Sequence, residues 1–363
     1  MTAHSQEDGS VILHVVPYDV SRGAERYARS LVDVMNETES DRHVLMTMFE
    51  GEEQSLDADL ALDVPRGLPR RLGFDPRVIL RLRKAVERLR PGCVVAHGGE
   101  SAKYAALALR GEIPFAYLVI GSNHPLLDNP LRRLMRDFYL SRAAAVVTVS
   151  SGLADEMRAA GVPDETLHVV PNGRDPDRFL PGEPSAREVS RLLFVGRLDD
   201  QKRPLLFVST FAEIRARGLL AAAMMVGGGP LYDSVSVAAS QVGIEVLGPR
   251  DDVPALLAQS DLLVLTSRPP EGMPGVLIEA GLSGLATVTT DVPGARDVVI
   301  DGLTGFVVGV DDETGLADAV EKLLVDDRLR AEMGRAARER CVTEFSLEAS
   351  AEGWRRVLDG VTS

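Results

Sequence analysis

The stretch DLLVLTSRPPEGMPGVLIEAGLSGLATVTTD, residues 261–291, decides the fold that we expect of this chain. Its first seven residues, DLLVLTS, and its last six, ATVTTD, have the length and the β-branched and apolar content typical of strands. Between them, Pro274 opens a segment with helical spacing, and proline is well tolerated in the first turn of a helix. A strand, a helix and a second strand in this order are typical of a parallel sheet covered by helices.

The same alternation runs along the chain in two series. The first predicts strands at 11–18, 43–50, 91–97, 114–121 and 144–151. After a segment rich in proline and glycine, the second predicts strands at 191–198, 221–228, 244–249, 261–267, 286–291 and 305–309. We therefore expect an α/β protein with two Rossmann-like doubly wound domains that face each other across a cleft.

The two series also give the expected domain boundaries, since 363 residues are enough for two domains of ordinary size. We expect an N-terminal domain over 1–170, a linker over 171–190 and a C-terminal domain over 191–345. The helix expected within 346–363 follows both sheets and is predicted to return to the first domain. Ligands of open α/β sheets bind beyond the carboxyl ends of the strands, so the cleft is the expected site.

Composition excludes several classes of protein. No run of 18 apolar residues exists, and the polar start MTAHSQEDGS is unlike a signal peptide. The two cysteines, Cys93 and Cys341, are too few for a disulfide framework or a structural zinc site, so we expect a cytoplasmic protein with reduced thiols. A net charge of −14 argues against non-specific binding of nucleic acid.

The charge is distributed unevenly. Residues 1–170 hold 20 basic and 24 acidic side chains, whereas 171–363 hold 20 and 30. Within the first half, 66–90 has nine basic residues against two acidic ones, and LRRLMRDFYLSR (131–142) is a second cationic segment with interleaved apolar residues. Two interpretations stay open: solvated arginine-rich helices, and a surface that faces an anionic lipid bilayer or an anionic substrate.

Two cations follow the first strand of the second series. In LLFVGRLDDQKRP, residues 192–204, Gly196 ends the apolar run and is followed by Arg197 and Lys202. Glycine lets the backbone turn close to a ligand, and two cations at a strand end suit an anionic group such as a diphosphate. The alternative is a pair of ordinary surface cations.

Two carboxylates, Glu271 and Glu279, bracket the turn that precedes the helix opened by Pro274. The N-terminus of that helix directs free N–H groups and a partial positive charge towards any ligand there. Glu279 lies about 7.5 Å along the helix axis, which is too far for the ~5–5.5 Å carboxylate pair of a retaining glycosidase. The pair suits two hydroxyl-bearing parts of one elongated ligand, and the alternative is two solvated side chains.

Other motifs exclude familiar cofactor sites. VGGGPL (226–231) follows a strand but lacks the GxGxxG spacing, which argues against an NAD-dependent dehydrogenase, and no GxxxxGK[ST] occurs anywhere. The Asp-Pro-Asp at 175–177 imitates a metal-binding Asp-x-Asp but falls in the expected linker. We expect neither a metal nor a cofactor.

Five motifs in register resemble those of the retaining glycosyltransferases of family 4, which have the two-domain GT-B fold. They are the Glu–seven–Glu stretch, the Gly-Arg-x(4)-Lys stretch, PNGRDPDRF (171–179), VGGGPL and VVTVSSGLADEM (146–157). The match in order and spacing extends from about residue 11 to the end, weakly over 40–135. Each motif alone is modest, but five in register are specific.

The resemblance implies roles for individual residues of the second domain. Arg197 and Lys202 would bind the diphosphate of the donor, and Glu279 would accept hydrogen bonds from its ribose hydroxyls. Glu271 would hold the hydroxyls of the donor sugar together with the backbone of Gly272, Met273, Pro274, Gly275 and Val276. Arg250 lies where the family recognises the base, largely through backbone groups.

In the first domain, which would bind the acceptor, the resemblance places Gly23 in a glycine-rich turn that approaches the diphosphate. Arg22-Gly23 stands where the family usually has Gly-Gly. His97 resembles a histidine near the transferred sugar, and the alternative is a satisfied histidine at a strand end. Pro293 and Asp297 stand where the family more often has glycine and glutamate, a difference to which we assign no effect.

The function implied is transfer of a sugar, with retention, from a nucleoside-diphosphate donor to an acceptor hydroxyl on a small molecule, a glycan or a glycolipid. A UDP-sugar is the expected donor, because it is frequent in the family. The 36 arginines against four lysines indicate a high-GC bacterial genome. The alternative is a sugar-nucleotide-binding protein or partner subunit without turnover.

Overall fold

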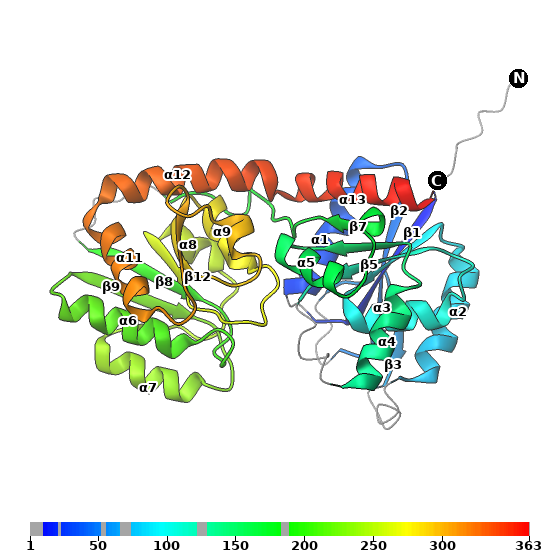
Figure 1. Ribbon diagram of the computed structural model, residues 1–363, viewed down its shortest axis with the longest axis horizontal. Coiled ribbons are helices and arrows are strands. Elements are labelled where there is room, and N and C mark those ends of the chain that lie inside the picture. The colour runs from blue at the N-terminus through cyan, green and yellow to red at the C-terminus, as the bar shows by residue number, and fades with distance from the viewer. Residues whose placement is uncertain are drawn as a thin grey trace, which may run out of the picture. The chain divides into compact units, whose positions relative to one another are not determined.

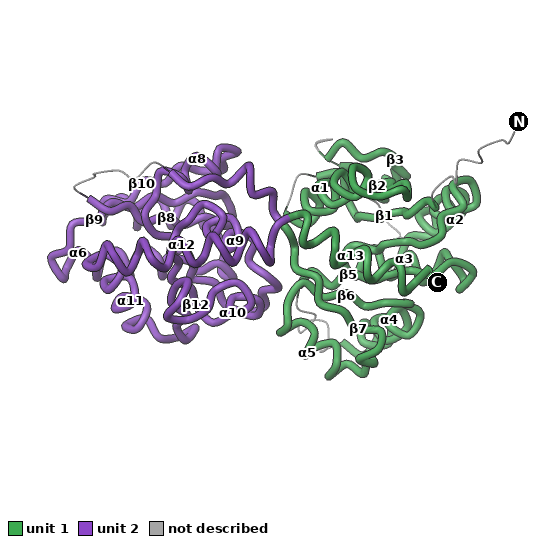
Figure 2. The backbone as a smooth tube through the Cα atoms, turned by 90° about the horizontal axis from the view of Figure 1, so that it is seen from above, with its two compact units in different colours: residues 1–173, 347–363 green, residues 174–346 purple. Residues whose placement is uncertain are grey.

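The computed structural model describes residues 10–20, 23–51, 56–65, 74–121, 129–182 and 189–362. The chain divides into two compact units, residues 1–173 with 347–363 (unit 1) and residues 174–346 (unit 2), coloured green and purple in Figure 2. It thus passes from unit 1 to unit 2 after Gly173 and returns after Ser346. The expected linker is split between the units, and its residues 183–188 lie outside the described ranges.

Unit 1 contains a seven-stranded parallel sheet in the order β3-β2-β1-β4-β5-β6-β7. Figure 1 labels β1, β2, β3, β5 and β7 of this sheet. The strands are β1 (Val11–Tyr18), β2 (Arg42–Phe49), β3 (Leu60–Val64), β4 (Cys93–His97), β5 (Phe115–Val119), β6 (Ala145–Thr148) and β7 (Leu167–Val169). Every residue of β4, β5 and β6 is buried, as helices on both faces of a parallel sheet require.

The helices of unit 1 are α1 (Gly23–Thr38), α2 (Pro76–Leu89), α3 (Gly98–Ala108), α4 (Pro130–Leu140), α5 (Ser151–Ala159) and α13 (Leu347–Thr362), with a short 3-10 turn at Asp164–Thr166. Three of these helices begin at a capping side chain. The side chains of Asp75, Asn129 and Ser150 accept hydrogen bonds from N–H groups in the first turns of α2, α4 and α5. Proline at the first position of α2 and α4 adds to the same start signal.

Helix α13 joins unit 1 through a buried polar network. The indole Nε1 of Trp354 donates to the hydroxyl of Tyr27 on α1 at 3.0 Å, and that hydroxyl lies 2.6 Å from Ser350 Oγ. Ser350 in turn donates to the carbonyl of Pro171 at 2.8 Å. Because buried polar groups need partners, this network fixes α13 against α1 and the strand end before Gly173.

Unit 2 contains a six-stranded parallel sheet in the order β10-β9-β8-β11-β12-β13. Its strands are β8 (Ser190–Val195), β9 (Ala221–Val226), β10 (Glu245–Val246), β11 (Leu262–Leu265), β12 (Ala286–Thr290) and β13 (Gly305–Val308). Its helices are α6 (Pro204–Ala216), α7 (Tyr232–Val242), α8 (Val253–Ala258), α9 (Gly275–Leu282), α10 (Ala295–Val298), α11 (Glu313–Val325) and α12 (Asp327–Glu344). Phe194, Phe207 and Phe211 are central to its apolar core.

The strand order reverses once in each sheet, between β1 and β4 in unit 1 and between β8 and β11 in unit 2. The prediction of two doubly wound parallel sheets is confirmed. Loops that leave neighbouring strands in opposite directions open a crevice at such a reversal, and ligands of this fold class bind there. A ligand site is therefore expected at the loops after β1, β4, β8 and β11.

Candidate functional site

In unit 2, the loops after β8 and β11 meet in an ion pair. The Lys202 ammonium lies 2.5 Å from Glu271 Oε2, and the two side chains are 18% and 11% exposed. Thr266, just after β11, donates from Oγ1 to the carbonyl of Lys202 at 2.8 Å, and Lys202 N donates to Asp199 Oδ1 at 3.1 Å. The sheet order thus brings together two predicted site residues that are far apart in sequence.

The glycines of VGGGPL have a structural explanation. Gly227 adopts φ +140°, and a Cβ there would lie 1.9 Å from the carbonyl oxygen of Gly196. Leu198 N donates to the carbonyl of Gly228 at 2.9 Å, so this loop supports the backbone on which Arg197 is carried. The Arg197 side chain is 63% exposed and pairs with Asp199 at 3.0 Å.

Glu279 has a partner that the sequence did not reveal as a site residue. Arg174 Nε lies 2.9 Å from Glu279 Oε1, and both side chains are less than a fifth exposed. A Cβ on Gly275 would lie 2.0 Å from Arg174 Nη2. The glycine at the start of α9 therefore leaves room for the guanidinium beside the carboxylate, and Arg174 belongs to the candidate site.

The predicted sugar-binding backbone, Gly272–Val276, leads into α9, whose N-cap residue is Pro274. The first N–H groups of a helix have no acceptor within it, and the partial positive charge there suits hydroxyl or phosphate oxygens. Gly294 adopts φ +76°, and a Cβ there would lie 2.3 Å from the Gly272 carbonyl oxygen. The segment before α10 thus packs tightly on this loop, while Pro293 and Asp297 remain without an assigned effect.

Arg250 follows β10 and forms a two-pronged pair with Asp252, with N···O distances of 2.8 and 2.6 Å. Hydrogen bonding to that carboxylate raises the pKa of the Arg250 guanidinium. The pair lies between β10 and α8, and the structure shows no contact that joins Arg250 to Lys202 among the described residues.

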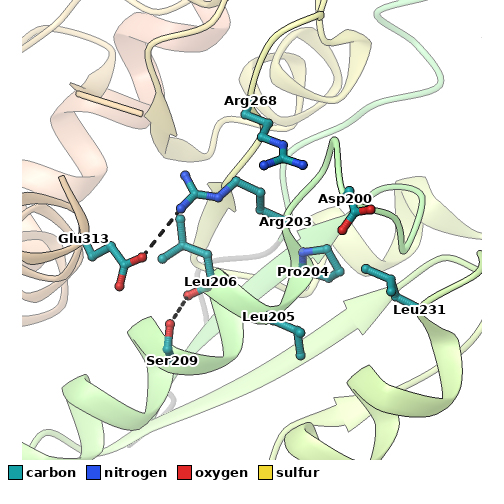
Figure 3. A pocket seen from close by; sticks show the side chains of 9 residues that line it. All are labelled: Asp200, Arg203, Pro204, Leu205, Leu206, Ser209, Leu231, Arg268 and Glu313. Atoms are coloured by element: carbon teal, nitrogen blue, oxygen red, sulfur yellow. Dashed lines mark hydrogen bonds and ion pairs between the residues drawn. The ribbon is translucent and has the colours of Figure 1, made fainter. Parts of the chain in front are cut away.

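A pocket of about 340 Å³ opens at the start of α6, beside the loops that follow β8 and β11 (Figure 3). It is lined by Asp200, Arg203, Pro204, Leu205, Leu206, Ser209, Leu231, Arg268 and Glu313. Arg203 pairs with Glu313 at 3.5 Å within it. Its charges are mixed in sign and none of the predicted site residues lines it, so we do not assign it to the predicted ligand.

In unit 1, a cavity of about 190 Å³ lies at the strand reversal. It is lined by Val16 and Pro17 of β1, Ala24 and Glu25 of α1, His97 to Glu100 at the junction of β4 and α3, and Ile120. Burial lowers the pKa of the His97 imidazole to about 3, so the ring is neutral at physiological pH.

Gly23 is exposed at the start of α1, and a Cβ there would meet no described atom within 4 Å. Arg22, which stands in the predicted glycine-rich turn, lies outside the described residues. The structure therefore brings His97 to the cavity and places Gly23 directly before Ala24, which lines it.

The Asp-Pro-Asp segment forms a turn, since Asp175 Oδ1 accepts from the backbone N–H of Asp177 at 2.9 Å. Among the described residues, no group of three or more histidine, cysteine or acidic side chains is arranged to hold a metal ion. Within the same residues, none of the helices is both long enough and apolar enough to cross a membrane.

Comparison with known proteins gives matches to two family models. Residues 189–326 match the model described as Glycosyl transferases group 1, and residues 21–178 match the one described as Glycosyltransferase Family 4. The GDP-mannose-dependent alpha-(1-6)-phosphatidylinositol monomannoside mannosyltransferase of Mycobacterium tuberculosis H37Rv is 30% identical over 273 residues, covering 66% of this chain and 69% of that protein.

The N-acetyl-alpha-D-glucosaminyl L-malate synthase of Bacillus anthracis is 29% identical over 246 residues, which cover 63% of this chain and 61% of that protein. The chain thus spans about three fifths of the length of this curated relative.

Two solved structures share the fold. Anabaena HepE in complex with UDP and glucose superposes with a TM-score of 0.82 at 18% identity, covering 96% of this chain and 99% of HepE. Sucrose-phosphate synthase from Thermosynechococcus elongatus gives 0.81 at 18% identity, with 96% and 98% coverage. Together with the two doubly wound sheets, these likenesses establish the two-domain GT-B fold.

Proposed function

Because this chain belongs to the glycosyltransferases of family 4, we propose that it moves a sugar from a nucleoside-diphosphate donor to an acceptor hydroxyl, with retention of configuration. The observation that carries the proposal is the Lys202–Glu271 ion pair at the strand reversal of unit 2. It places a cation and a hydrogen-bond acceptor where a doubly wound sheet binds its ligand.

The leaving group is the first requirement of the reaction. As the glycosidic bond breaks, negative charge grows on the diphosphate, and a fixed cation in a partly buried site stabilises that charge. Lys202 is positioned for this by Glu271 and by the anchored backbone of its loop. Arg197, which is exposed and pairs with the neighbouring Asp199, is assigned the role of the second cation.

The carboxylates hold the rest of the donor. Glu271 and the Gly272–Val276 backbone are assigned to the hydroxyls of the donor sugar. Glu279, oriented by Arg174, is assigned to the ribose. The backbone near Arg250 is assigned to the base. In unit 1, His97 and the turn at Gly23 are assigned to the transferred sugar and the diphosphate.

The proposed chemistry needs no covalent nucleophile. The acceptor hydroxyl attacks the anomeric carbon from the face that the diphosphate leaves, and the departing phosphate oxygen takes the proton of that hydroxyl. The bond to the leaving oxygen breaks as the new glycosidic bond forms on the same face, so configuration is retained. The protein contributes positioning and electrostatic stabilisation.

We propose a UDP-sugar as donor, since UDP donors are common among family members. The alternative is a GDP-sugar: one relative is GDP-mannose-dependent, whereas HepE was solved in complex with UDP. A thermal-shift panel of UDP-, GDP-, ADP- and TDP-sugars selects the donor. Product capture with that donor, followed by the anomeric coupling constant in proton NMR, then tests transfer and retention.

Turnover separates this proposal from mere binding. A transferase is expected to hydrolyse its donor slowly in the absence of acceptor, whereas a sugar-nucleotide-binding subunit gives a thermal shift without hydrolysis or transfer. Shift without any turnover across the panel would contradict the proposal.

We also propose that the protein acts in the cytoplasm and docks at the inner face of the membrane through α4. Leu131 and Leu134 are 70% and 67% exposed, and Arg132 and Arg133 between them are exposed as well. Apolar side chains flanked by cations suit an anionic bilayer surface. Of the other cationic segment, 66–90, residues 66–73 lie outside the described residues. Arg81 and Arg83 of its helix α2 donate to main-chain carbonyls within unit 1, so we assign docking to α4 instead.

A further inference from the structure

Three histidines and a glutamate form a continuous line of hydrogen bonds across the sheet of unit 1. His97 Nε2 lies 3.1 Å from His14 Nδ1, and His14 Nε2 lies 3.0 Å from His43 Nδ1. His43 Nε2 lies 3.1 Å from Glu39 Oε2. The line begins at the cavity lined by His97 and ends at Glu39, just beyond α1.

The sheet itself produces this alignment. His43 is on β2, His14 on β1 and His97 on β4, which are neighbours in that order. His43 pairs with Ile12, two residues before His14, and Val15 pairs with Ala96, one residue before His97. From β2 to β1 and from β1 to β4, the histidine thus moves two residues along the strand relative to the register. Because side chains alternate between the faces of a strand, a shift of two places all three rings on one face.

All three rings are neutral at physiological pH. Burial lowers the pKa of His97 to about 3, and burial together with His97, His43 and Arg29 lowers that of His14 well below its usual value. Burial also lowers the pKa of His43, although Glu39 and Asp41 oppose this. A neutral imidazole has one N–H donor and one acceptor nitrogen. The role of one nitrogen therefore fixes the role of the other, and with it the donor and the acceptor in the next hydrogen bond of the line.

Glu39 sets that direction. Its other oxygen, Oε1, forms an ion pair with Arg355, 3.3 Å from Nε, and a carboxylate in an ion pair accepts hydrogen bonds without donating any. His43 therefore donates from Nε2 and accepts at Nδ1, and His14 does the same. His97 must then donate from Nε2, which leaves the lone pair on its Nδ1.

That lone pair has no partner in the described part of the chain, although the atom is buried. The indole of Trp354 on α13 stacks near the His97 ring, at 6.4 Å between ring centroids and 29° between planes. A buried acceptor without a partner is rare and points to a ligand that donates a hydrogen bond.

We infer that Glu39, His43 and His14 are positioning residues that hold His97 in the Nε2–H tautomer, so that its Nδ1 accepts a hydrogen bond from a sugar hydroxyl. This inference rests on the proposed function for the identity of the ligand. A hydroxyl is suited because it can donate to Nδ1 and accept from N–H groups at the start of α3, Gly98–Glu100. A carbonyl or carboxylate oxygen has no proton to donate, so its own lone pairs would repel the lone pair on Nδ1.

Nitrogen-15 NMR of the imidazole rings of the free protein tests the tautomer directly. In the wild type, His97 is expected to be protonated at Nε2 and unprotonated at Nδ1. Glu39→Gln keeps the size but allows the amide either to donate or to accept, so His97 is expected to become a mixture of tautomers. A wild-type His97 protonated at Nδ1, or an unchanged ring in Glu39→Gln, would overturn the inference.

Two controls are built into the chain. Glu352→Gln removes another carboxylate that pairs with Arg355, at 2.5 Å, but leaves the line intact, so the His97 signals should not move. His168, on β7 and outside the line, should keep its signals in every variant.

Kinetics then show whether the line acts through His97. Glu39→Gln is expected to lower kcat/KM about two- to tenfold, the worth of one hydrogen bond, in the wild-type background and not at all in His97→Ala. An equal loss in both backgrounds would mean a structural role and would overturn the inference. Absence of sugar transfer by the wild type would instead refute the proposed function, while the NMR outcome would still decide the tautomer.

Discussion

The Lys202 ammonium and the Glu271 carboxylate, 69 positions apart, lie within 2.5 Å of each other. Lys202 is predicted to bind the diphosphate and Glu271 to bind the sugar. The two side chains with these predicted roles therefore form one ion pair. Each charge has little exposure to water, so removing one leaves the other poorly compensated. Substitutions at this pair should affect ligand binding and stability together.

Lys202→Ala is expected to lower kcat/KM by about 100-fold or more, because a fixed charge facing the leaving group is lost. Steady-state kinetics with the best donor measure the effect. Lys322→Ala is the matched control, since Lys322 is exposed in the same unit and lies over the ring of Phe306. Activity of Lys202→Ala within twofold of wild type would contradict the role.

Gly275→Ala is expected to weaken binding of nucleoside diphosphate about tenfold, because the new methyl displaces the Arg174 guanidinium from Glu279. The side chain of Arg174 can move, so the melting temperature should change little. Calorimetric titration and thermal melting measure the two effects. Gly360→Ala, on α13 with no atom within 4 Å of the added carbon, should alter neither. Unchanged affinity in Gly275→Ala would show that the Arg174–Glu279 pair does not contact the ligand.

The pH dependence of stability should reflect the buried histidines. The pKa of His97 is depressed from 6.5 to about 3, so between these values the unfolded chain binds more protons than the folded one. The contribution of neutral His97 to the free energy of unfolding is complete above about pH 6.5 and is lost as the pH falls towards 3. At pH 5 the loss amounts to about 2 kcal/mol.

Denaturant titrations followed by Trp354 fluorescence at pH 7.5 and 5.0 measure this loss. His97→Gln should lose less stability than the wild type over the same interval. An equal loss in both proteins would assign the pH dependence to other groups.

Leu131→Ser combined with Leu134→Ser is expected to reduce binding to phosphatidylglycerol vesicles about tenfold or more at low salt, since two exposed leucines no longer enter the bilayer. Co-sedimentation at low and high salt measures binding, and high salt should weaken the electrostatic part of it. Leu220→Ser is the matched control, because Leu220 is 73% exposed in unit 2. Salt-independent binding, or none by the wild type, would contradict docking through α4.

Much of the fold could be predicted because a parallel sheet buries its strands on both faces, which leaves continuous apolar runs such as AVVT and LLVL. Strands β3 and β7, LALDV and LHV, were missed because they are edge strands with few buried residues. Helix α12 was missed as well, since its 18 residues are charged on most sides and bury only Met333, Gly334, Ala337 and Cys341.

For the site, spacing in the sequence predicted Glu271, Glu279 and Lys202, and the family resemblance predicted His97, but neither predicted the partners of these residues. Arg174 lies 105 positions from Glu279, and their contact depends on how α9 packs, which local patterns do not encode. His14 and His43 are ordinary members of strand runs until the strand order places them beside His97.

The return of α13 to unit 1 has a consequence for synthesis of the protein. The ribosome synthesises residues 174–346 before Trp354. Packing of unit 1 therefore stays incomplete until the whole of unit 2 has been synthesised, because the indole of Trp354 stacks near His97 and donates to Tyr27. Domains usually fold as they emerge, N-terminal first. Here the N-terminal unit finishes last. Since Trp354 is the sole tryptophan of the chain, its fluorescence should record that final step during refolding.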